Sequence, residues 1–170
     1  SRRGGHPSPC ACAGIARLRF PTSSRRSRRA ASKRRPRMVV VDTNILAYLL
    51  IEGDRTADAQ ALFRRDAEWR SEGFVLIEFS NILATYQRAG ALSRSAAETM
   101  LATAERVVSG LVNLPHGRAL KLAAEFGVSA YDARFLGAAQ NLGARLVTED
   151  ARLRTAAPSL TCSLAEALAA

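Results

Sequence analysis

Four acidic residues occupy positions at which an ionised side chain is unexpected without a partner. Three of them follow a short apolar run, and one opens an apolar helix pattern: Asp42, Glu78, Asp150 and Asp132. A carboxylate at the end of a buried element is costly to desolvate unless another group pairs with it. The four acids therefore either cap helices or belong to a common functional site.

Short apolar runs predict strands that are buried on both faces. We expect about five of them, at Met38–Val41, Phe74–Ile77, Leu111–Leu114, Arg145–Thr148 and Leu160–Cys162. Segments of helical period alternate with these runs, at Asn44–Ile51, Thr56 to about Ser71, Phe79–Arg88, Ser95–Val108 (opened by a Ser95–Glu98 capping box), Gly117–Phe126, Ala130–Leu142, Asp150–Ala156 and Leu164–Ala169. Such alternation indicates right-handed crossovers and a parallel sheet. The sequence therefore predicts a three-layer α/β fold.

In parallel α/β folds, ligands bind beyond the carboxyl ends of the strands, where helix N-termini also lie. This rule places all four acids on one rim of the predicted sheet. Clustered carboxylates raise one another's pKa, and a hard cation relieves their repulsion. Oxygen ligands without His or Cys suit Mg²⁺ or Mn²⁺. An acid-lined site of this kind favours phosphoryl-transfer or phosphodiester chemistry.

Each acid also has a purely structural interpretation. Asp42 and Asp150 could each cap the helix that follows them. Glu78 and Asp132 could be first-turn acids that the helix dipole stabilises. Taken singly, the structural and functional interpretations are equally good, and only the shared rim favours a site.

The positive charge of the chain lies in its first 37 residues. They hold 12 of the 25 Lys and Arg residues and none of the 15 acids, so residues 38–170 carry a net charge of −2. The predicted domain is therefore not a nucleic-acid binder by net charge alone. We expect residues 1–37 to be a disordered extension. We favour translation from upstream of a true start at Met38; a transit peptide and an RNA-binding arm are the alternatives.

The few Cys and His residues of the chain offer little for metal or redox chemistry. Cys10, Cys12 and Cys162 do not have the spacing of a zinc site, and His6 and His116 are the only histidines. Sparse cysteine usage fits a reducing cytoplasm, where we expect the protein to act. No apolar run approaches the roughly 20 residues of a membrane span, so we expect no membrane partner.

Four segments of the sequence together resemble a known family. VVVDTNILAYLL, VLIEFSNIL, VSAYDARFLGAA and LVTEDARL, in this order and spacing, resemble the PIN-domain nucleases, and more narrowly the VapC-type toxin ribonucleases of bacterial toxin–antitoxin pairs. The resemblance covers about residues 38–170. It implies an α/β/α fold that binds Mg²⁺ or Mn²⁺ at a carboxylate cluster and cleaves single-stranded RNA.

The resemblance also implies roles for individual residues. By motif position, the catalytic and metal-binding acids are Asp42, Glu78, Asp132 and Asp150, and the supporting polar residues are Thr43, Asn44 and Thr148. Glu149 places a second acid beside Asp150, and the T-x-D spacing favours Asp150. Arg134 and Arg152 are candidate RNA phosphate contacts near the rim, and the alternative for Arg134 is an exposed residue on the helix surface, which we favour. Toxins of this family generally form homodimers and pair with a small antitoxin protein.

Three other functions are compatible with parts of the sequence. A free-standing PIN-domain RNA-processing nuclease and a non-catalytic RNA- or protein-binding module both stay open as alternatives. A phosphotransferase with Asp42 as nucleophile is disfavoured, because a haloacid-dehalogenase-like hydrolase has a second Asp where this chain has Asn44. Such enzymes and receiver domains also need a Lys near the site, and the predicted domain has only Lys121, in the middle of a helix.

Overall fold

The computed structural model describes residues 38–170, and the basic extension expected at residues 1–37 lies outside the described residues. Within the described part, four parallel strands form one sheet of order β2-β1-β3-β4. Their bounds are β1 Val39–Val41, β2 Trp69–Arg70, β3 Leu146–Val147 and β4 Thr161–Cys162. In the central strand, Val40 pairs with Arg70 on one side and with Leu146 on the other. The central strand β1 is buried along its whole length, as its apolar sequence predicts.

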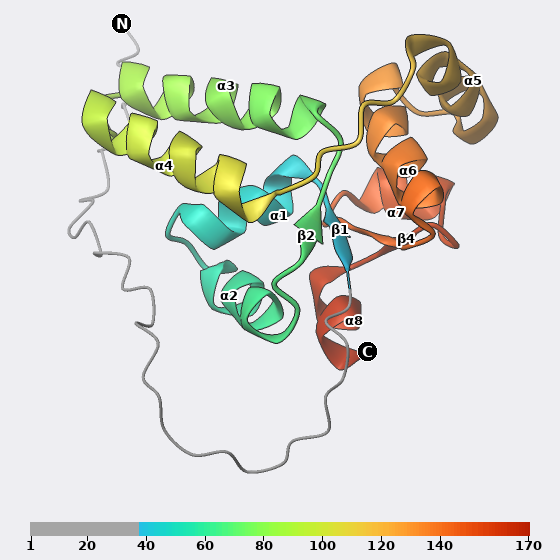
Figure 1. Ribbon diagram of the computed structural model, residues 1–170, viewed down its shortest axis with the longest axis horizontal. Coiled ribbons are helices and arrows are strands. Elements are labelled where there is room, and N and C mark those ends of the chain that lie inside the picture. Colours follow the sequence, from blue (N-terminus) through green and yellow to red (C-terminus); the bar gives the residue numbers. More distant parts are fainter. Residues whose placement is uncertain (1–37) are drawn as a thin grey trace, which may run out of the picture. The chain divides into compact units, whose positions relative to one another are not determined.

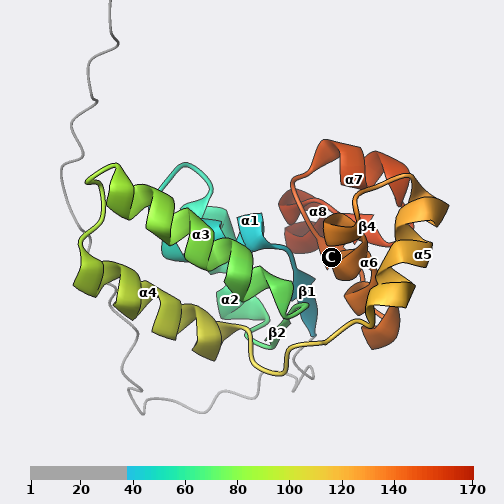
Figure 2. The same ribbon diagram turned by 90° about the horizontal axis from the view of Figure 1, so that it is seen from above.

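Helices cover the sheet on both sides. The described chain contains α1 Thr43–Leu50, α2 Thr56–Arg65, α3 Phe74–Arg88, α4 Arg94–Val107, α5 His116–Phe126, α6 Ala130–Leu142, α7 Ala151–Ala156 and α8 Leu164–Ala169. Figures 1 and 2 show α1 to α4 on one side of β1, and α5, α6 and α7 on the other. The predicted three-layer α/β architecture is therefore confirmed.

The strand expected at Phe74–Ile77 is wrong, because these residues form the first turn of helix α3. Glu78 consequently lies in the second turn of a helix and not after a strand. The buried residues of this helix, Val75, Phe79 and Leu83, recur every four positions. This helical spacing runs through the supposed strand boundary and buries one face of α3, which explains why the apolar run is helical.

The second strand lies earlier in the chain, at Trp69–Arg70. The helix expected from Thr56 to about Ser71 therefore ends sooner, at Arg65. Trp69 is fully buried, and its ring meets that of Phe63 edge-on at a centroid distance of 5.3 Å. Burial of this large ring next to the central strand outweighs the weak helical preference of the segment.

The segment Leu111–Leu114 does not become a fifth strand. Val112 forms only an isolated parallel bridge with Glu72. The Val112 N–H donates to the Ser71 carbonyl at 2.8 Å, and the Val112 carbonyl accepts from the Gly73 N–H at 2.9 Å. The sheet of the described residues therefore has four strands where about five were expected.

The expected capping box at the start of α4 is also wrong. The N-cap is Ser93, whose hydroxyl accepts from the Ala96 N–H at 3.2 Å, and not Ser95. Glu98 instead pairs with Arg94 one turn earlier, at 3.0 Å. Polar helical residues follow both serines in the sequence, so the sequence pattern alone did not show which of the two is the N-cap.

Two helices in the C-terminal part of the chain have the predicted bounds. Helix α6 spans Ala130–Leu142 and α8 spans Leu164–Ala169, as expected. Both begin at a serine cap, and α6 ends at Gly143, which adopts the left-handed conformation with φ 62°. No helix of the described residues is long and apolar enough to cross a membrane.

Gly143 and Gly117 allow a paired test of the helix ends. A methyl group added at either position meets no atom within 4 Å, so any difference must come from backbone conformation. We expect Gly143→Ala to lower the free energy of unfolding by about 1 kcal/mol, because it forces alanine into the left-handed region. Gly117→Ala, inside α5, should raise it by roughly 0.5 kcal/mol. Urea unfolding measures both, and a shift of the same sign for both variants would contradict this account.

Candidate active site

All four predicted acids line one cavity at the carboxyl edge of the sheet. The cavity has a volume of about 290 Å³, and its lining residues are Asp42, Thr43, Asn44, Glu78, Asn81, Ile82, Asp132, Phe135, Asp150 and Leu153. The acids come from the end of β1, from α3, from α6 and from the loop after β3. The chain therefore brings together side chains up to 108 positions apart in the sequence, and their catalytic role stays a prediction.

Asp42 is the most buried of the four acids. It caps α1, with Oδ1 accepting from the Ile45 N–H at 2.9 Å. Its other oxygen, Oδ2, accepts from the Thr148 hydroxyl at 2.5 Å. Burial raises the pKa of Asp42 to about 6, although these hydrogen bonds pull it down, and the negative charge of Glu78 adds to the rise. Asp42 therefore both caps α1 and lines the cavity, so the two interpretations of this residue do not exclude each other.

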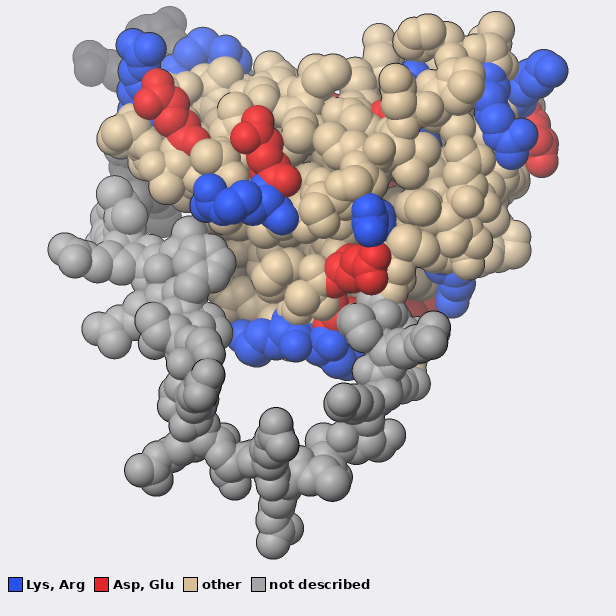
Figure 3. All heavy atoms as spheres, in the orientation of Figure 1, with Lys and Arg blue, Asp and Glu red and all other residues tan. Residues whose placement is uncertain are grey.

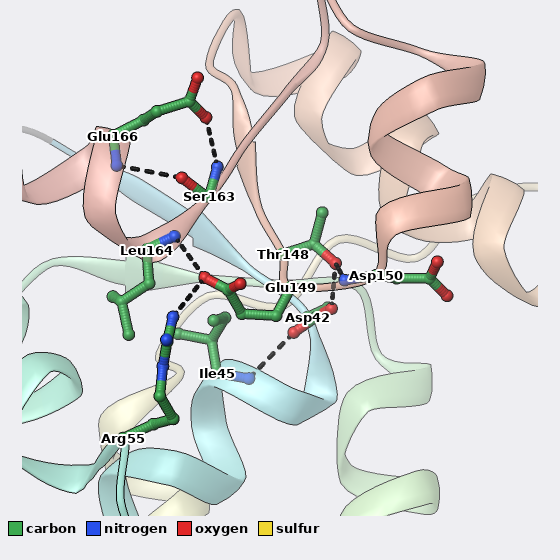
Figure 4. A network of polar contacts seen from close by, with 9 residues as sticks. All are labelled: Asp42, Ile45, Arg55, Thr148, Glu149, Asp150, Ser163, Leu164 and Glu166. Atoms are coloured by element: carbon green, nitrogen blue, oxygen red, sulfur yellow. Dashed lines mark hydrogen bonds and ion pairs between the residues drawn. The ribbon is translucent and has the colours of Figure 1, made fainter.

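Thr148 links the central strand to the loop that carries the fourth acid. Its side chain is fully buried at the end of β3. Besides donating to Asp42, its hydroxyl oxygen accepts from the Asp150 N–H at 3.0 Å. These two bonds hold Asp42 and the Asp150 backbone together, as Figure 4 shows. This pair of bonds is what a supporting residue would make, and the supporting role of Thr148 stays a prediction.

Asp150 and Glu149 point in opposite directions (Figure 4). Asp150 lines the cavity and caps α7, with Oδ1 accepting from the backbone of Arg152 and Leu153 at 2.8 and 3.1 Å. Glu149 turns away, and its Oε1 accepts from Arg55 and from the Leu164 N–H, both at 2.8 Å. Of the two neighbouring acids, only Asp150 is placed to act in the cavity.

Glu78 reaches the cavity from the second turn of α3. The Thr43 hydroxyl, at the start of α1, donates to Oε2 of Glu78. Asn44 also lines the cavity, next to Thr43. Asn81 joins them three residues after Glu78, and sequence reasoning missed it. Its i, i+3 spacing from Glu78 on a helix was the available signal, but the wrong strand at Phe74–Ile77 hid it.

Asp132 lies in the first turn of α6 and is held by the cap of that helix. The Ser129 hydroxyl donates to Oδ2 of Asp132 at 2.7 Å and accepts from the Asp132 N–H at 3.1 Å. Ser129 was not among the predicted site residues. The Ser-x-x-Asp spacing was the signal for it, because an N-cap and the third helical residue bond reciprocally.

The two predicted phosphate contacts have different surroundings. Arg152 lines a second hollow of about 210 Å³, which shares Asp132 and Asp150 with the acid cavity. Arg134 pairs instead with the buried carboxylate of Glu72, and its other guanidinium nitrogen lies 3.3 Å from His116 Nδ1. Contact of either arginine with RNA stays a prediction, and Arg134 already has a competing partner.

The donor chemistry of the cavity fits a hard cation that keeps much of its own water. Among residues 38–170, no three Asp, Glu, His or Cys side chains lie close enough together to enclose an ion. The cavity nevertheless offers carboxylate, amide and hydroxyl oxygens, and burial works against the charge of Asp42. Mg²⁺ binds through one or two carboxylates and several waters, so this arrangement suits it. Asp42, Glu78, Asp132 and Asp150 line the cavity and would hold such an ion directly or through its water molecules.

The raised pKa of Asp42 has a consequence for stability. In the folded chain Asp42 keeps its proton up to about pH 6, whereas the unfolded chain loses it near 3.8. The folded state therefore binds more protons in this interval, and the free energy of unfolding falls as pH rises through it. Asp42→Asn should remove this loss of stability. Without metal at pH 7, its free energy of unfolding should be higher than that of the parent chain by on the order of 2 kcal/mol.

Urea unfolding in EDTA between pH 3.5 and pH 7 measures the effect. The two free energies should approach each other at the acid end of this range, where Asp42 is protonated in both states. A constant difference between the chains across the whole range would show that the Asp42 proton has no part in it.

The chain is similar to known proteins in both sequence and fold. Residues 39–157 match the PIN domain family. Ribonuclease VapC3 from Pyrobaculum aerophilum is 28% identical over 126 residues, which cover 72% of this chain and 96% of that protein. The crystal structure of PAE2754 from the same organism has a similar fold, with a TM-score of 0.64 at 23% identity, covering 78% of this chain and 96% of the other. The chain therefore belongs to the PIN domain family.

Proposed function

We propose that this protein is a metal-dependent endoribonuclease that cuts single-stranded RNA. The observation that carries the proposal is the convergence of Asp42, Glu78, Asp132 and Asp150 on one cavity. Membership of the PIN domain family and similarity to a protein named as a ribonuclease support nuclease chemistry. The preference for single strands and the requirement for Mg²⁺ or Mn²⁺ rest on the family resemblance and on the oxygen-rich donor set.

We assign each acid a role according to how firmly hydrogen bonds hold its carboxylate. Asp42 is fixed at both oxygens, by the Ile45 N–H and the Thr148 hydroxyl, so it supplies a rigid negative charge at the base of the cavity. Asp132 and Asp150 are each anchored through one oxygen by helix-cap bonds. A bound Mg²⁺ would polarise a phosphate oxygen and acidify a water molecule. We propose that Glu78, which lines the same cavity, orients the attacking water or shares in holding the cation.

The RNA strand needs positive charge that the described residues supply only locally. On the face shown in Figure 3, Lys and Arg side chains are interspersed with Asp and Glu and do not merge into one positive surface. Arg152 in the hollow beside Asp132 and Asp150 is a candidate contact for a phosphate next to the scissile one. We propose that the strand passes over the acid cavity and this hollow together.

We further propose that the protein is the toxin of a toxin–antitoxin pair and acts in the cytoplasm as a homodimer. The name of Ribonuclease VapC3 and the motif resemblance support the toxin role and a small antitoxin partner. A free-standing RNA-processing nuclease shares the same site chemistry, and cleavage assays alone do not separate the two. Inhibition of cleavage by the product of a neighbouring short gene would favour the toxin.

Cleavage of a labelled single-stranded RNA with Mg²⁺ tests the catalytic assignment. EDTA should abolish cleavage, and Asp42→Asn or Asp150→Asn should lower its rate by on the order of 100-fold or more, because each removes a carboxylate charge from the cavity. Glu149→Gln is the matched control, because Glu149 neighbours Asp150 but points to Arg55. It should keep most of the activity.

Full activity of Asp42→Asn would contradict the assignment of the acid cavity. Equal cleavage of a fully paired duplex would contradict the proposed preference for single strands, while leaving the metal site intact. A loss in Glu149→Gln as large as in Asp150→Asn would show that the T-x-D spacing alone does not identify the catalytic acid.

Light scattering on the eluting protein tests the proposed homodimer. The chain has a mass of 18.3 kDa, and we expect a particle of about twice this mass at micromolar concentration. A single 18.3 kDa species at micromolar concentration would contradict the proposed dimer. It would not bear on the proposed cleavage chemistry.

A further inference from the structure

One buried acid of the structure has no part in the proposed chemistry. Glu72 is fully buried between β2 and α3. Its Oε1 accepts from the Arg134 guanidinium and from the Leu114 N–H at 3.1 Å. Its Oε2 accepts from the Phe74 N–H at 2.6 Å. Burial alone would raise the pKa of Glu72, but the bonds from Arg134 and these two amides outweigh it and hold the pKa below its usual value.

The Glu72–Arg134 ion pair joins two helices that carry acids of the cavity. Glu72 lies two residues before the start of α3, which holds Glu78, and Arg134 follows Asp132 by two positions on α6. Helix α3 packs against α1 and α4, whereas α6 packs against α5, β1 and β3. Figures 1 and 2 show α3 and α6 on opposite sides of β1. Direct contacts between the starts of α3 and α6 can therefore influence the distance between the two acids.

A second contact joins the starts of the same two helices, α3 and α6. The rings of Phe74 and Tyr131 stack with centroids 5.0 Å apart and an interplanar angle of 18°. Phe74 lies one turn before Glu78 on the same face of α3, and Tyr131 is the neighbour of Asp132. Offset aromatic stacking prefers a narrow range of separations, so the pair restricts how the helix starts approach each other.

We propose that these two contacts, Glu72–Arg134 and Phe74–Tyr131, form a brace that sets the separation of Glu78 and Asp132 and thereby the cation affinity of the cavity. The proposal rests on the proposed metal-dependent function. Arg134 is in this view a positioning residue whose guanidinium is engaged by Glu72. The Arg134 contact with His116 extends the brace to the start of α5.

Calorimetric titration of the full metal-free chain with Mn²⁺ tests the brace. Arg134→Met removes the charge but keeps much of the side-chain length, and should lower the Mn²⁺ affinity by about 10-fold or more, which is the size of loss seen when groups that orient metal ligands are removed. Arg134→Lys keeps the charge but lacks the planar guanidinium, so its Mn²⁺ affinity should lie between those of the parent chain and Arg134→Met. Tyr131→Leu alters a side chain that is 60% exposed, so it should fold normally and still lose affinity.

Val107→Ala is the matched control for stability. Val107 is buried on α4, which contributes no residue to the cavity. This variant should unfold at lower urea concentration and bind Mn²⁺ as the parent chain does. Parental Mn²⁺ affinity in both Arg134→Met and Tyr131→Leu would overturn the proposal, because both arms of the brace would then be dispensable.

Hydrogen exchange of the same metal-free proteins separates failure of the brace from failure of the proposed function. If the parent chain binds no Mn²⁺, the proposed metal-dependent function is wrong. The exchange data still test whether the brace holds the starts of α3 and α6 together. Arg134→Met and Tyr131→Leu should speed amide exchange in the first turns of α3 and α6 while leaving α4 unchanged. Unchanged exchange in those turns would overturn the brace, with or without metal binding.

Discussion

The structure depends on how the carboxylate of Asp42 is accommodated at the end of the central strand. An ionised group in this buried place is expensive, and two bonds, from the Ile45 N–H and the Thr148 hydroxyl, only partly compensate it. Burial still raises the pKa of Asp42 to about 6, so part of this cost is left uncompensated. A cation in the cavity would supply the missing charge, so the energetic cost of Asp42 and the proposed chemistry have one origin.

The other acids are arranged around this carboxylate by elements from both layers. Thr148 bonds to both Asp42 and the Asp150 backbone, so β1 and the loop after β3 share one hydroxyl. Glu78 comes from the layer of α1 and α3, and Asp132 from the layer of α6. Local helix caps hold Asp132 and Asp150, whereas Glu78 is held by Thr43, 35 positions away. Local cap bonds therefore hold Asp132 and Asp150, whereas bonds between residues far apart in the sequence hold Asp42 and Glu78.

The sequence predicted those parts of the site that follow from local rules. The bounds of α6, the cap position of Asp150 and the end of β1 at Asp42 all come from short-range patterns, and the structure agrees with them. The apolar run Phe74–Ile77 was assigned to the wrong element, because four apolar residues suit a buried strand and a buried helix turn equally. Glu78 still lines the cavity, since a helix that enters from the rim also presents its early turns there.

The remaining features depend on partners that a sequence pattern does not pair. Glu72 lies 62 positions from Arg134, and nothing in either segment predicts that they meet. Arg134 looked like an exposed helix residue, and its engagement by Glu72 is visible only in three dimensions. Asn81 was within reach of helical spacing but was hidden by the misplaced strand. Long-range pairing and one wrong element thus account for the missing parts.

The central claim, that the buried charge of Asp42 belongs to a divalent-cation site, is tested most directly by titrating the metal-free chain with Mn²⁺ in buffers of different ionisation enthalpy. Because the pKa of Asp42 is about 6, binding should release protons at pH 6 and fewer at pH 7.5. Asp42→Asn should lose both the affinity and the pH-dependent proton release. Binding of unchanged affinity in Asp42→Asn, or no binding to the parent chain, would contradict the account.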